Sequence, residues 1–298
     1  MIPRVVATVA ELRQAVSEAR RDGRTIGLVP TMGALHKGHG ALMDRARAEG
    51  SFVVVSIFVN PLQFDRPEDY EQYARSMPAD HEFCGEHGVD LVFAPTVGEV
   101  YPHPQQVHVE APALSEYLCG KYRPGHFRGV ATVVTKLFNM AQPDRAYFGE
   151  KDAQQLAIVQ ALVADLNLPI AIVPVATVRE QDGLAMSSRN ARLSATERRR
   201  AATLYRALIV VAEELSSGAT PDRAREAGLG VLRTEPAIRL EYLEIVDPDS
   251  LHPIEAVRGP VRIAAAVWMG ETRLIDNVLH RAGSAQANAS ASFTAPGQ

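Results

Sequence analysis

Residues 26–49 read IGLVPTMGALHKGHGALMDRARAE, and this stretch decides which fold the sequence predicts. It begins with a short apolar run, Ile26–Val29, which has the length of a buried strand. A turn that contains Gly33 and Gly38 follows, and amphipathic sequence of helix length begins at about His39. A buried strand that leads through a turn into a helix is typical of α/β proteins, so we expect a parallel sheet covered by crossover helices.

The same alternation of short apolar runs and longer amphipathic stretches continues along the chain. Further strands are predicted at 52–59, 90–94, 146–149 and 170–175. Helices are predicted at 39–49, 68–87, 129–141 and 153–166. Because the two kinds of element alternate, the sheet is expected to be buried on both faces.

A polar, Gly-containing loop at 177–190 separates this part from a smaller C-terminal part. A prior of about 150 residues per domain predicts two domains for a chain of 298 residues. We assign residues 1–188 to the first domain and residues 189–282 to the second. The second begins at a capping box, Ser194 to Glu197, and is predicted to be α+β. Its helices are predicted to end at about 216 and 234, and its strands to cover 239–246, 261–268 and 273–279.

Composition limits the partners and the compartment. The chain is 46% hydrophobic and 22% charged with a net charge of -4, and it has no Lys/Arg block, so neither nucleic acid nor a membrane surface is an expected partner. Cys84 and Cys119 have no metal-ligand spacing, and no apolar run approaches the roughly 18 residues of a membrane helix. We therefore expect a soluble, cytoplasmic protein. Residues 283–298, rich in Ala and Ser without periodicity, predict a disordered tail.

The turn after the first predicted strand is a candidate anion site. In open α/β sheets ligands bind beyond the carboxyl ends of the strands, and a helix N-terminus offers free N–H groups and a favourable dipole. Gly33 and Gly38 would let a phosphate approach the backbone closely. His36 and His39, three residues apart, are expected on one face of the first helical turn. A single HxxH pair more often lies on the surface without a function, so the assignment of a phosphate site needs support from other segments.

A second segment, Met186–Asn190, supplies such support. It reads MSSRN and follows a later predicted strand. The hydroxyls of Ser187 and Ser188 and the guanidinium of Arg189 can hold phosphates. Together with HKGH at 36–39 it resembles the HIGH and KMSKS-type signatures of nucleotidyltransferases and class I aminoacyl-tRNA synthetases.

Three more segments narrow the resemblance. They read FVNPLQF at 58–64, RPGHFRGV at 123–130 and FGEKDAQQ at 148–155. With them the sequence closely resembles the pantoate–β-alanine ligase family from about residue 2 to about residue 281. The resemblance implies a Rossmann-like N-terminal domain, a smaller C-terminal lid and a homodimer. It also implies ATP-dependent, Mg²⁺-assisted condensation of pantoate with β-alanine through a pantoyl-adenylate, with release of AMP and pyrophosphate.

The resemblance also implies site residues. For ATP they are Pro30, Thr31, Met32, Gly33, His36, His39, Gly149, Lys151, Asp152, Val178, Met186, Ser187, Ser188 and Arg189. For pantoate they are Met32, Gln63, Arg123 and Gln155. The catalytic group comprises His36, His39, Lys151, Ser187, Ser188 and Arg189. Asp80 is the match for the acidic Mg²⁺ contact, although residues 73–76 read YARS where the family often has YPRT.

The chemistry of this assignment is consistent. Pantoate must attack the α-phosphorus with its own carboxylate, so an Arg clamped on that carboxylate would stabilise the ground state as well as the transition state. The neutral amides of Gln63 and Gln155 can orient the acid while its charge stays available. The mixed anhydride is sensitive to water, so the C-terminal domain is expected to close over it.

Three alternatives share part of this pattern. A nucleotidyltransferase that leaves AMP on its product would use the same HxGH and serine loop, but it has no reason for two Gln-bearing strand ends. A class I tRNA synthetase is disfavoured by the absence of a basic surface and of an anticodon-binding extension. A nucleotide-binding module without catalysis would bind ATP but would not exchange pyrophosphate into it when pantoate is added.

Overall fold

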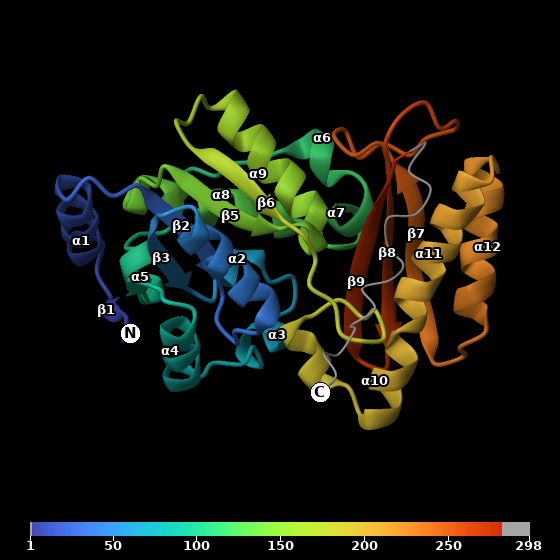
Figure 1. Ribbon diagram of the computed structural model, residues 1–298, viewed down its shortest axis with the longest axis horizontal. Helices are drawn as coiled ribbons and strands as arrows, with labels where there is room; N and C mark the ends of the chain where they lie inside the picture. Colours follow the sequence, from blue (N-terminus) through green and yellow to red (C-terminus); the bar gives the residue numbers. More distant parts are fainter. Residues whose placement is uncertain (1, 282–298) are drawn as a thin grey trace, which may run out of the picture.

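The computed structural model describes residues 2–281, and the tail predicted at 283–298 lies outside them. Within the described residues the strands form two sheets (Figure 1). The larger sheet has the order β1-β4-β3-β2-β5-β6, and every neighbouring pair in it is parallel. Its strands are β1 (Arg4–Val6), β2 (Ile26–Thr31), β3 (Phe52–Ile57), β4 (Leu91–Phe93), β5 (Arg145–Gly149) and β6 (Ala171–Val175).

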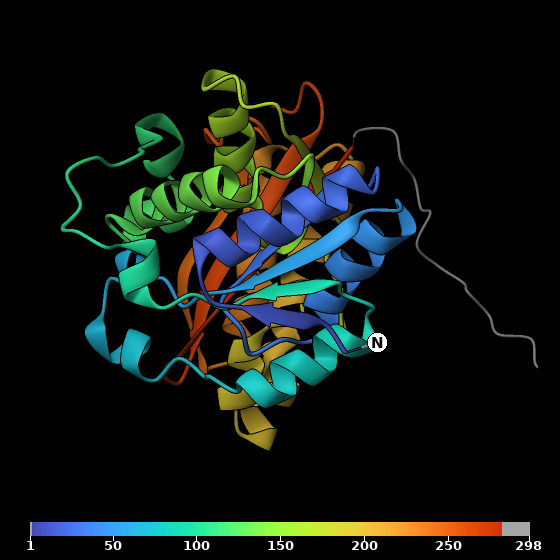
Figure 2. The same cartoon turned by 90° about the vertical axis from the view of Figure 1, so that its left-hand side faces the viewer.

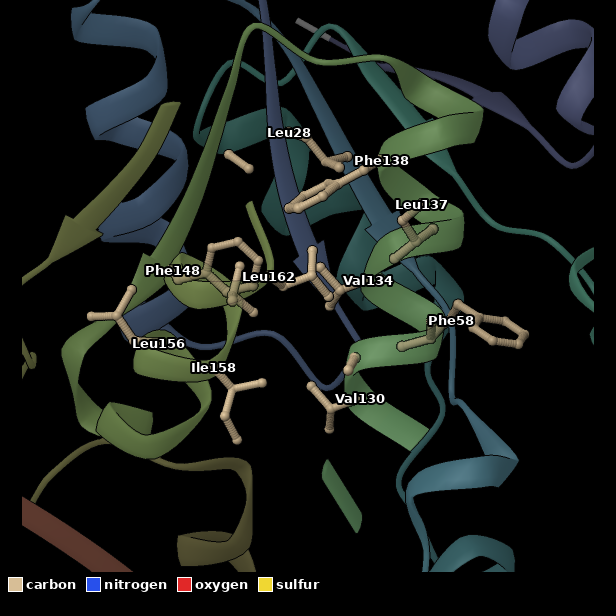
Figure 3. Close-up of a cluster of buried hydrophobic side chains, with 14 of the residues drawn as sticks. Leu28, Phe58, Val130, Val134, Leu137, Phe138, Phe148, Leu156, Ile158 and Leu162 are labelled. Carbon is tan, nitrogen blue, oxygen red and sulfur yellow. The ribbon is translucent and has the colours of Figure 1, made fainter. Parts of the chain in front are cut away.

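Helices cover both faces of this sheet, as the apolar runs predicted. Leu28 and Val54 belong to a hydrophobic cluster on one face, whereas the next residues along the strands, Val29 and Val55, belong to a cluster on the other. The helices of the first face are α1 (Val9–Arg21), α8 (His126–Ala141) and α9 (Ala153–Asp165). Those of the second face are α2 (Lys37–Ala48) and α4 (Met77–Glu86). Figure 3 shows side chains of α8 and α9 meeting Leu28 and Phe148 of the sheet.

The smaller sheet is antiparallel and belongs to the C-terminal part. It is formed by β7 (Ile238–Val246), β8 (Val261–Met269) and β9 (Thr272–His280). One face packs on α11 (Thr203–Ser216) and α12 (Pro221–Arg233). The other face contributes Tyr242, Ala264 and Ala266 to the core of the parallel-sheet domain. In Figure 2 the parallel sheet lies in front of these C-terminal strands.

The structure confirms the α/β class and the smaller α+β part. Each strand predicted from an apolar run is present, and the capping box of Ser194 and Glu197 begins α10 (Ala195–Ala201). The domain boundary after residue 188 stays a prediction; the large sheet ends at Val175, and Leu184 already packs in the C-terminal cluster. Not predicted were β1, α1 and the short helices α5 (Val97–Val100), α6 (Pro112–Ser115) and α7 (Leu118–Tyr122).

The helix predicted at 68–87 is wrong as a single element. It consists of α3 (Pro67–Glu71) and α4, with non-helical residues between them. Pro78 lies in the first turn of α4. In a continuous helix its ring would clash with the carbonyl of Ala74, whereas in a first turn its missing N–H has no cost. Tyr73 lies in the non-helical segment between the two helices and lines the cavity described below.

The order of the parallel strands determines where a ligand would bind. From β2 the chain adds β3 and β4 on one side, whereas β5 pairs with β2 on the other side and β6 follows it. The carboxyl ends of β2 and β5 are therefore the point at which the winding direction reverses, and such points hold the ligands of open α/β sheets. Within residues 2–281 no helix combines the length and the apolar character needed to cross a membrane.

One close contact in this fold gives a stability prediction. A Cβ added at Gly129 of α8 would lie 2.2 Å from the carbonyl oxygen of Leu62 and 2.7 Å from the backbone nitrogen of Gln63, neither of which can move freely. Gly129→Ala should therefore lower the free energy of unfolding by about 1–3 kcal/mol in urea denaturation. Gly230→Ala is the matched control, because that exposed position in α12 has no atom within 4 Å of an added Cβ. It should stabilise the protein by about 0.5–1 kcal/mol, and equal effects of the two substitutions would contradict the prediction.

Candidate functional site

A cavity of about 260 Å³ lies at the carboxyl ends of β2 and β5. Residues from both sheets line it. All the site residues predicted from the sequence line this cavity except Gly33 and Asp80. Five segments that are far apart in sequence thus meet around one space, at the position that the strand order predicts.

The two histidines form a compact pair at the start of α2. His36 is the N-cap residue, and its Nδ1 accepts a hydrogen bond from the backbone N–H of Gly38 at 3.1 Å. The Nδ1 of His39 accepts one from the backbone N–H of His36 at 3.3 Å. The ring centroids are 4.1 Å apart. A Cβ at Gly38 would lie 2.8 Å from the His36 ring, so a glycine is needed there for the ring to fold back on its own helix.

These hydrogen bonds fix which tautomer each ring adopts. A backbone N–H only donates, so each Nδ1 must be the unprotonated nitrogen and each neutral ring carries its proton on Nε2. Burial lowers the pKa of His36 to about 4 and that of His39 to about 3, and the Lys151 ammonium adds to the effect on His36. Near neutral pH the pair therefore presents two uncharged Nε2–H donors.

Charged groups lie on the opposite strand end. The Nζ of Lys151, in η2 (Glu150–Asp152) directly after β5, is 3.6 Å from an oxygen of Asp152. Burial acts to raise the pKa of Asp152, but Lys151 and Arg189 outweigh it and hold that pKa below its ordinary value. A carboxylate and an ammonium side by side can recognise a ligand that carries both hydroxyls and phosphates.

The serine loop begins η3 (Ser188–Arg192). The Oγ of Ser187 accepts the backbone N–H of Arg189 at 3.3 Å, and Ser188 hydrogen-bonds to Tyr73. Burial lowers the pKa of Arg189, yet an arginine stays charged under all ordinary conditions. Within residues 2–281 the Arg189 guanidinium forms no ion pair, so its charge is available to an anion in the cavity.

A different set of contacts holds Gln63, which ends η1 (Pro61–Gln63) after β3. Its side-chain oxygen accepts from Asn60 at 3.0 Å, and its side-chain NH₂ lies 3.3 Å from the sulfur of Met32. A thioether is a weak acceptor, so the NH₂ group retains donor capacity for a ligand. Gln155, in the first turn of α9, also lines the cavity, and its side chain makes no hydrogen bond within the described part of the chain.

Arg123 lines the cavity but its charge is already engaged. Its guanidinium donates to one oxygen of Asp65 at 2.8 and 3.0 Å and to the backbone carbonyl of Gln63 at 3.2 Å. It also donates to the Nε2 of His126, whose Nδ1 donates to the same carbonyl at 2.7 Å. Burial lowers the pKa of His126 to about 3, which keeps this ring neutral. Arg123 and His126 thus fix the backbone from which Gln63 projects.

Two of the predicted site residues do not line the cavity. Gly33 has a φ of 82°, a left-handed conformation that glycine adopts without strain, and the ATP contact predicted for it stays a prediction. Asp80, predicted as a Mg²⁺ contact, does not line the cavity, and both of its oxygens accept backbone N–H groups, from Ala34 and Leu35. Within residues 2–281 no group of three or more His, Cys, Asp or Glu is placed to hold a metal ion.

The sequence did not reveal the contribution of β9. The side-chain NH₂ of Asn277 donates to the backbone carbonyls of Glu150 and Lys151, both at 2.9 Å, and so ties the C-terminal sheet to the loop that carries Lys151. Its neighbour Asp276, 2% exposed, forms a two-pronged ion pair with Arg179. Two adjacent polar residues between the apolar pairs 274–275 and 278–279 were the signal that could have identified them.

Comparison with known proteins agrees with this geometry. The chain matches the family model described as Pantoate-beta-alanine ligase over residues 4–279. The pantothenate synthetase of Sinorhizobium medicae is 51% identical over 276 residues, which cover 92% of this chain and 95% of that protein. The crystal structure of pantothenate synthetase from Thermus thermophilus aligns with a TM-score of 0.88 at 49% identity and covers 92% of this chain and 98% of that one.

A third match was solved with ligands. The pantoate–β-alanine ligase of Francisella tularensis, complexed with beta-gamma ATP and β-alanine, aligns with a TM-score of 0.77. It is 32% identical, and the match covers 93% of this chain and 97% of that one.

The buried neutral histidines predict a pH dependence of stability. His36, His39 and His126 have pKa values of about 4, 3 and 3 in the folded protein, against about 6.5 in an unfolded chain. Below about pH 6.5 the unfolded chain binds protons that the folded protein does not, so the free energy of unfolding should fall as the pH is lowered from about 7 to about 5.

Urea denaturation across this pH range provides the measurement. His126→Asn should flatten the dependence, because it removes one buried imidazole. His108→Asn is the control at an exposed histidine and should leave the slope unchanged. A wild-type free energy of unfolding that stays constant from about pH 7 to about pH 5 would show that the rings are not held neutral.

Proposed function

The chain belongs to the pantoate–β-alanine ligase family, and we propose that it condenses pantoate with β-alanine at the expense of ATP, through a pantoyl-adenylate, releasing pyrophosphate and AMP. One observation carries this proposal. The neutral histidine pair shares a single cavity with Lys151, with the serine loop and with two uncharged amides. The cavity thus combines groups suited to a triphosphate with groups suited to a hydroxy acid.

In the first half-reaction a carboxylate oxygen of pantoate attacks the α-phosphorus of ATP, and pyrophosphate leaves. Negative charge develops on the phosphoryl oxygens of the transition state. The Nε2–H groups of His36 and His39 and the ammonium of Lys151 are the donors proposed to stabilise that charge. Since the imidazoles are neutral, they donate hydrogen bonds without forming an ion pair that would hold the ground state equally strongly.

Pantoate is proposed to bind through Gln63, Gln155 and Met32. Arg123 lies close to them, but its guanidinium is occupied by Asp65 and by the carbonyl of Gln63. The acid therefore meets amides instead of a cation, and its carboxylate keeps its nucleophilic charge. Positioning is then the main source of rate acceleration in this half of the site, and no protein nucleophile is required.

The departing pyrophosphate is assigned to Ser187, Ser188 and Arg189, and the ribose to Asp152 and the backbone near Gly149. The remaining ATP contacts proposed from the sequence are Pro30, Thr31, Val178 and Met186, which also line the cavity. In the second half-reaction the amine of β-alanine attacks the acyl carbon, and AMP leaves. The Francisella tularensis relative, complexed with beta-gamma ATP and β-alanine, supports a site that accepts both compounds.

Mg²⁺ is proposed to enter with the triphosphate, whose oxygens provide most of its ligands in such sites. There it would neutralise part of the phosphate charge. The lid function proposed for residues 189–282 is supported by β9, which lines the cavity next to η2. The homodimer and the cytoplasmic location stay predictions.

A single-turnover experiment tests the function. The protein is mixed with ATP, pantoate and Mg²⁺ without any amine, and the products are separated after quenching. An enzyme-bound pantoyl-adenylate and one equivalent of pyrophosphate are expected, with pantothenate formed only after β-alanine is added. A stable adenylylated product that β-alanine does not consume would indicate a nucleotidyltransferase. ATP binding without pantoate-dependent pyrophosphate exchange would indicate a non-catalytic module.

The histidine pair should be essential for the first step. His36→Ala or His39→Ala should slow pantoyl-adenylate formation by about 10²–10³-fold, the range for loss of one transition-state donor. Because His36 also caps α2, His36→Asn is the sharper variant, since Asn keeps an N-cap acceptor but lacks the Nε2–H. It should be as slow as His36→Ala. Near-wild-type rates in the single-turnover assay would refute the role.

Gln63 should act on pantoate far more than on ATP. Gln63→Ala removes the amide but leaves the backbone held by Arg123 and His126, so we expect kcat/KM for pantoate to fall about tenfold or more while the Kd for ATP stays unchanged. Gln63→Glu should be worse, because a carboxylate there repels the acid. Titration calorimetry with ATP provides the control measurement, and equal losses for both substrates would contradict the assignment.

A further inference from the structure

Asp80 occupies an unusual place for a carboxylate. It lies in the first turn of α4 and is only 4% exposed. Its Oδ2 accepts the backbone N–H of Ala34 at 3.0 Å, and its Oδ1 accepts that of Leu35 at 2.7 Å. Both oxygens are therefore used by two successive peptide groups, in the turn that connects β2 to α2.

That turn has a backbone that needs support. Gly33 and Ala34 follow one another with φ angles of 82° and 51°. A left-handed conformation costs about 1–2 kcal/mol for a residue with a Cβ, so Ala34 adopts it only because its surroundings compensate. Within the described residues the N–H groups of Ala34 and Leu35 have only Asp80 as acceptor. Without it, two peptide N–H groups in a half-buried turn would lose their partner.

The turn leads directly into the histidine pair. Leu35 precedes His36, whose backbone N–H is the donor to the Nδ1 of His39 and whose ring caps α2. The orientation of the Leu35 peptide thus determines the position of His36, the N-cap residue of α2. A Cβ at Gly33 would lie 2.8 Å from the Oδ2 of Asp80, so the glycine and the carboxylate fit one another closely.

We propose that Asp80 is a positioning residue, which places the imidazoles of His36 and His39 by holding the turn at 33–35, and that it is not a Mg²⁺ ligand. This inference rests on the proposed function for its kinetic consequence. Its structural consequence is independent of the reaction, because it concerns the tautomers of two rings.

The test uses Asp80→Asn, alone and combined with Ala34→Gly. An amide offers only one oxygen, so one of the two N–H groups would face an NH₂ group and the turn should loosen. We expect adenylate formation to fall by about 10–100-fold, as for a catalytic group displaced by about 1 Å, with the half-saturating Mg²⁺ concentration unchanged. Ala34→Gly removes the cost of the left-handed conformation. The double variant should therefore form the adenylate several-fold faster than Asp80→Asn alone.

A matched control distinguishes this role from loss of a buried bond. Asp90 also accepts a backbone N–H, that of Val53 at 2.8 Å, but it lies at the other end of the sheet. Asp90→Asn should lower stability without slowing adenylate formation. Circular dichroism checks folding, and if Asp80→Asn does not fold alone, the comparison is made between Ala34→Gly and the double variant.

The second readout is the ¹⁵N spectrum of the histidine rings. In the wild type, His36 and His39 should each be the Nε2–H tautomer, and in Asp80→Asn the two tautomers should mix. Unchanged tautomers together with an unchanged rate would overturn the proposal. A raised Mg²⁺ requirement with no rescue by Ala34→Gly would also overturn it, in favour of a metal ligand. A wild type that makes no pantoyl-adenylate but has fixed tautomers would refute the proposed function and leave the positioning role standing.

Discussion

The parallel pairing of β2 with β5 is the constraint on which the rest of the site depends. These two strands are separated by more than a hundred residues, yet Gly27 and Leu28 lie directly beside Arg145 and Ala146. Because parallel strands end at the same edge of a sheet, the pairing brings the loop after β2 next to the loop after β5. One loop supplies imidazoles and the other supplies an ammonium and a carboxylate. Neither would form a site alone.

Burial then determines the chemical state of the groups that meet there. The histidines are held neutral by desolvation and by a nearby cation, and backbone N–H groups select which ring nitrogen carries the proton. Arg123, beside Gln63, is neutralised by Asp65, whereas Arg189 forms no ion pair with any residue that the structure describes. The polarity of the cavity is therefore divided into a cationic region, suited to phosphates, and a region of uncharged amides, suited to an acid whose carboxylate must remain reactive.

The sequence predicted those features that depend on neighbouring residues. Strands buried on both faces appear as apolar runs, and the loops at their carboxyl ends carry the His, Lys, Ser and Gln residues that the cavity contains. Other features were not predicted, some of them local and some dependent on distant contacts. The three residues of β1 are too few to show a pattern, and the break between α3 and α4 follows from one proline. The resemblance implied a metal contact for Asp80, and the hydrogen bonds that its oxygens accept from Ala34 and Leu35 could not be predicted from the sequence. Asn277 is separated from Lys151 by more than a hundred residues, so no local pattern relates the two.

The amide of Asn277 has a mechanical consequence. It holds the carbonyls of Glu150 and Lys151 from the other sheet, so any separation of the two domains must first break both bonds. Opening the cavity in this way would also release the backbone of the loop that carries the Lys151 ammonium. This coupling would protect a labile anhydride, since water would enter the cavity only after the loop that carries Lys151 had lost its contacts with the C-terminal sheet.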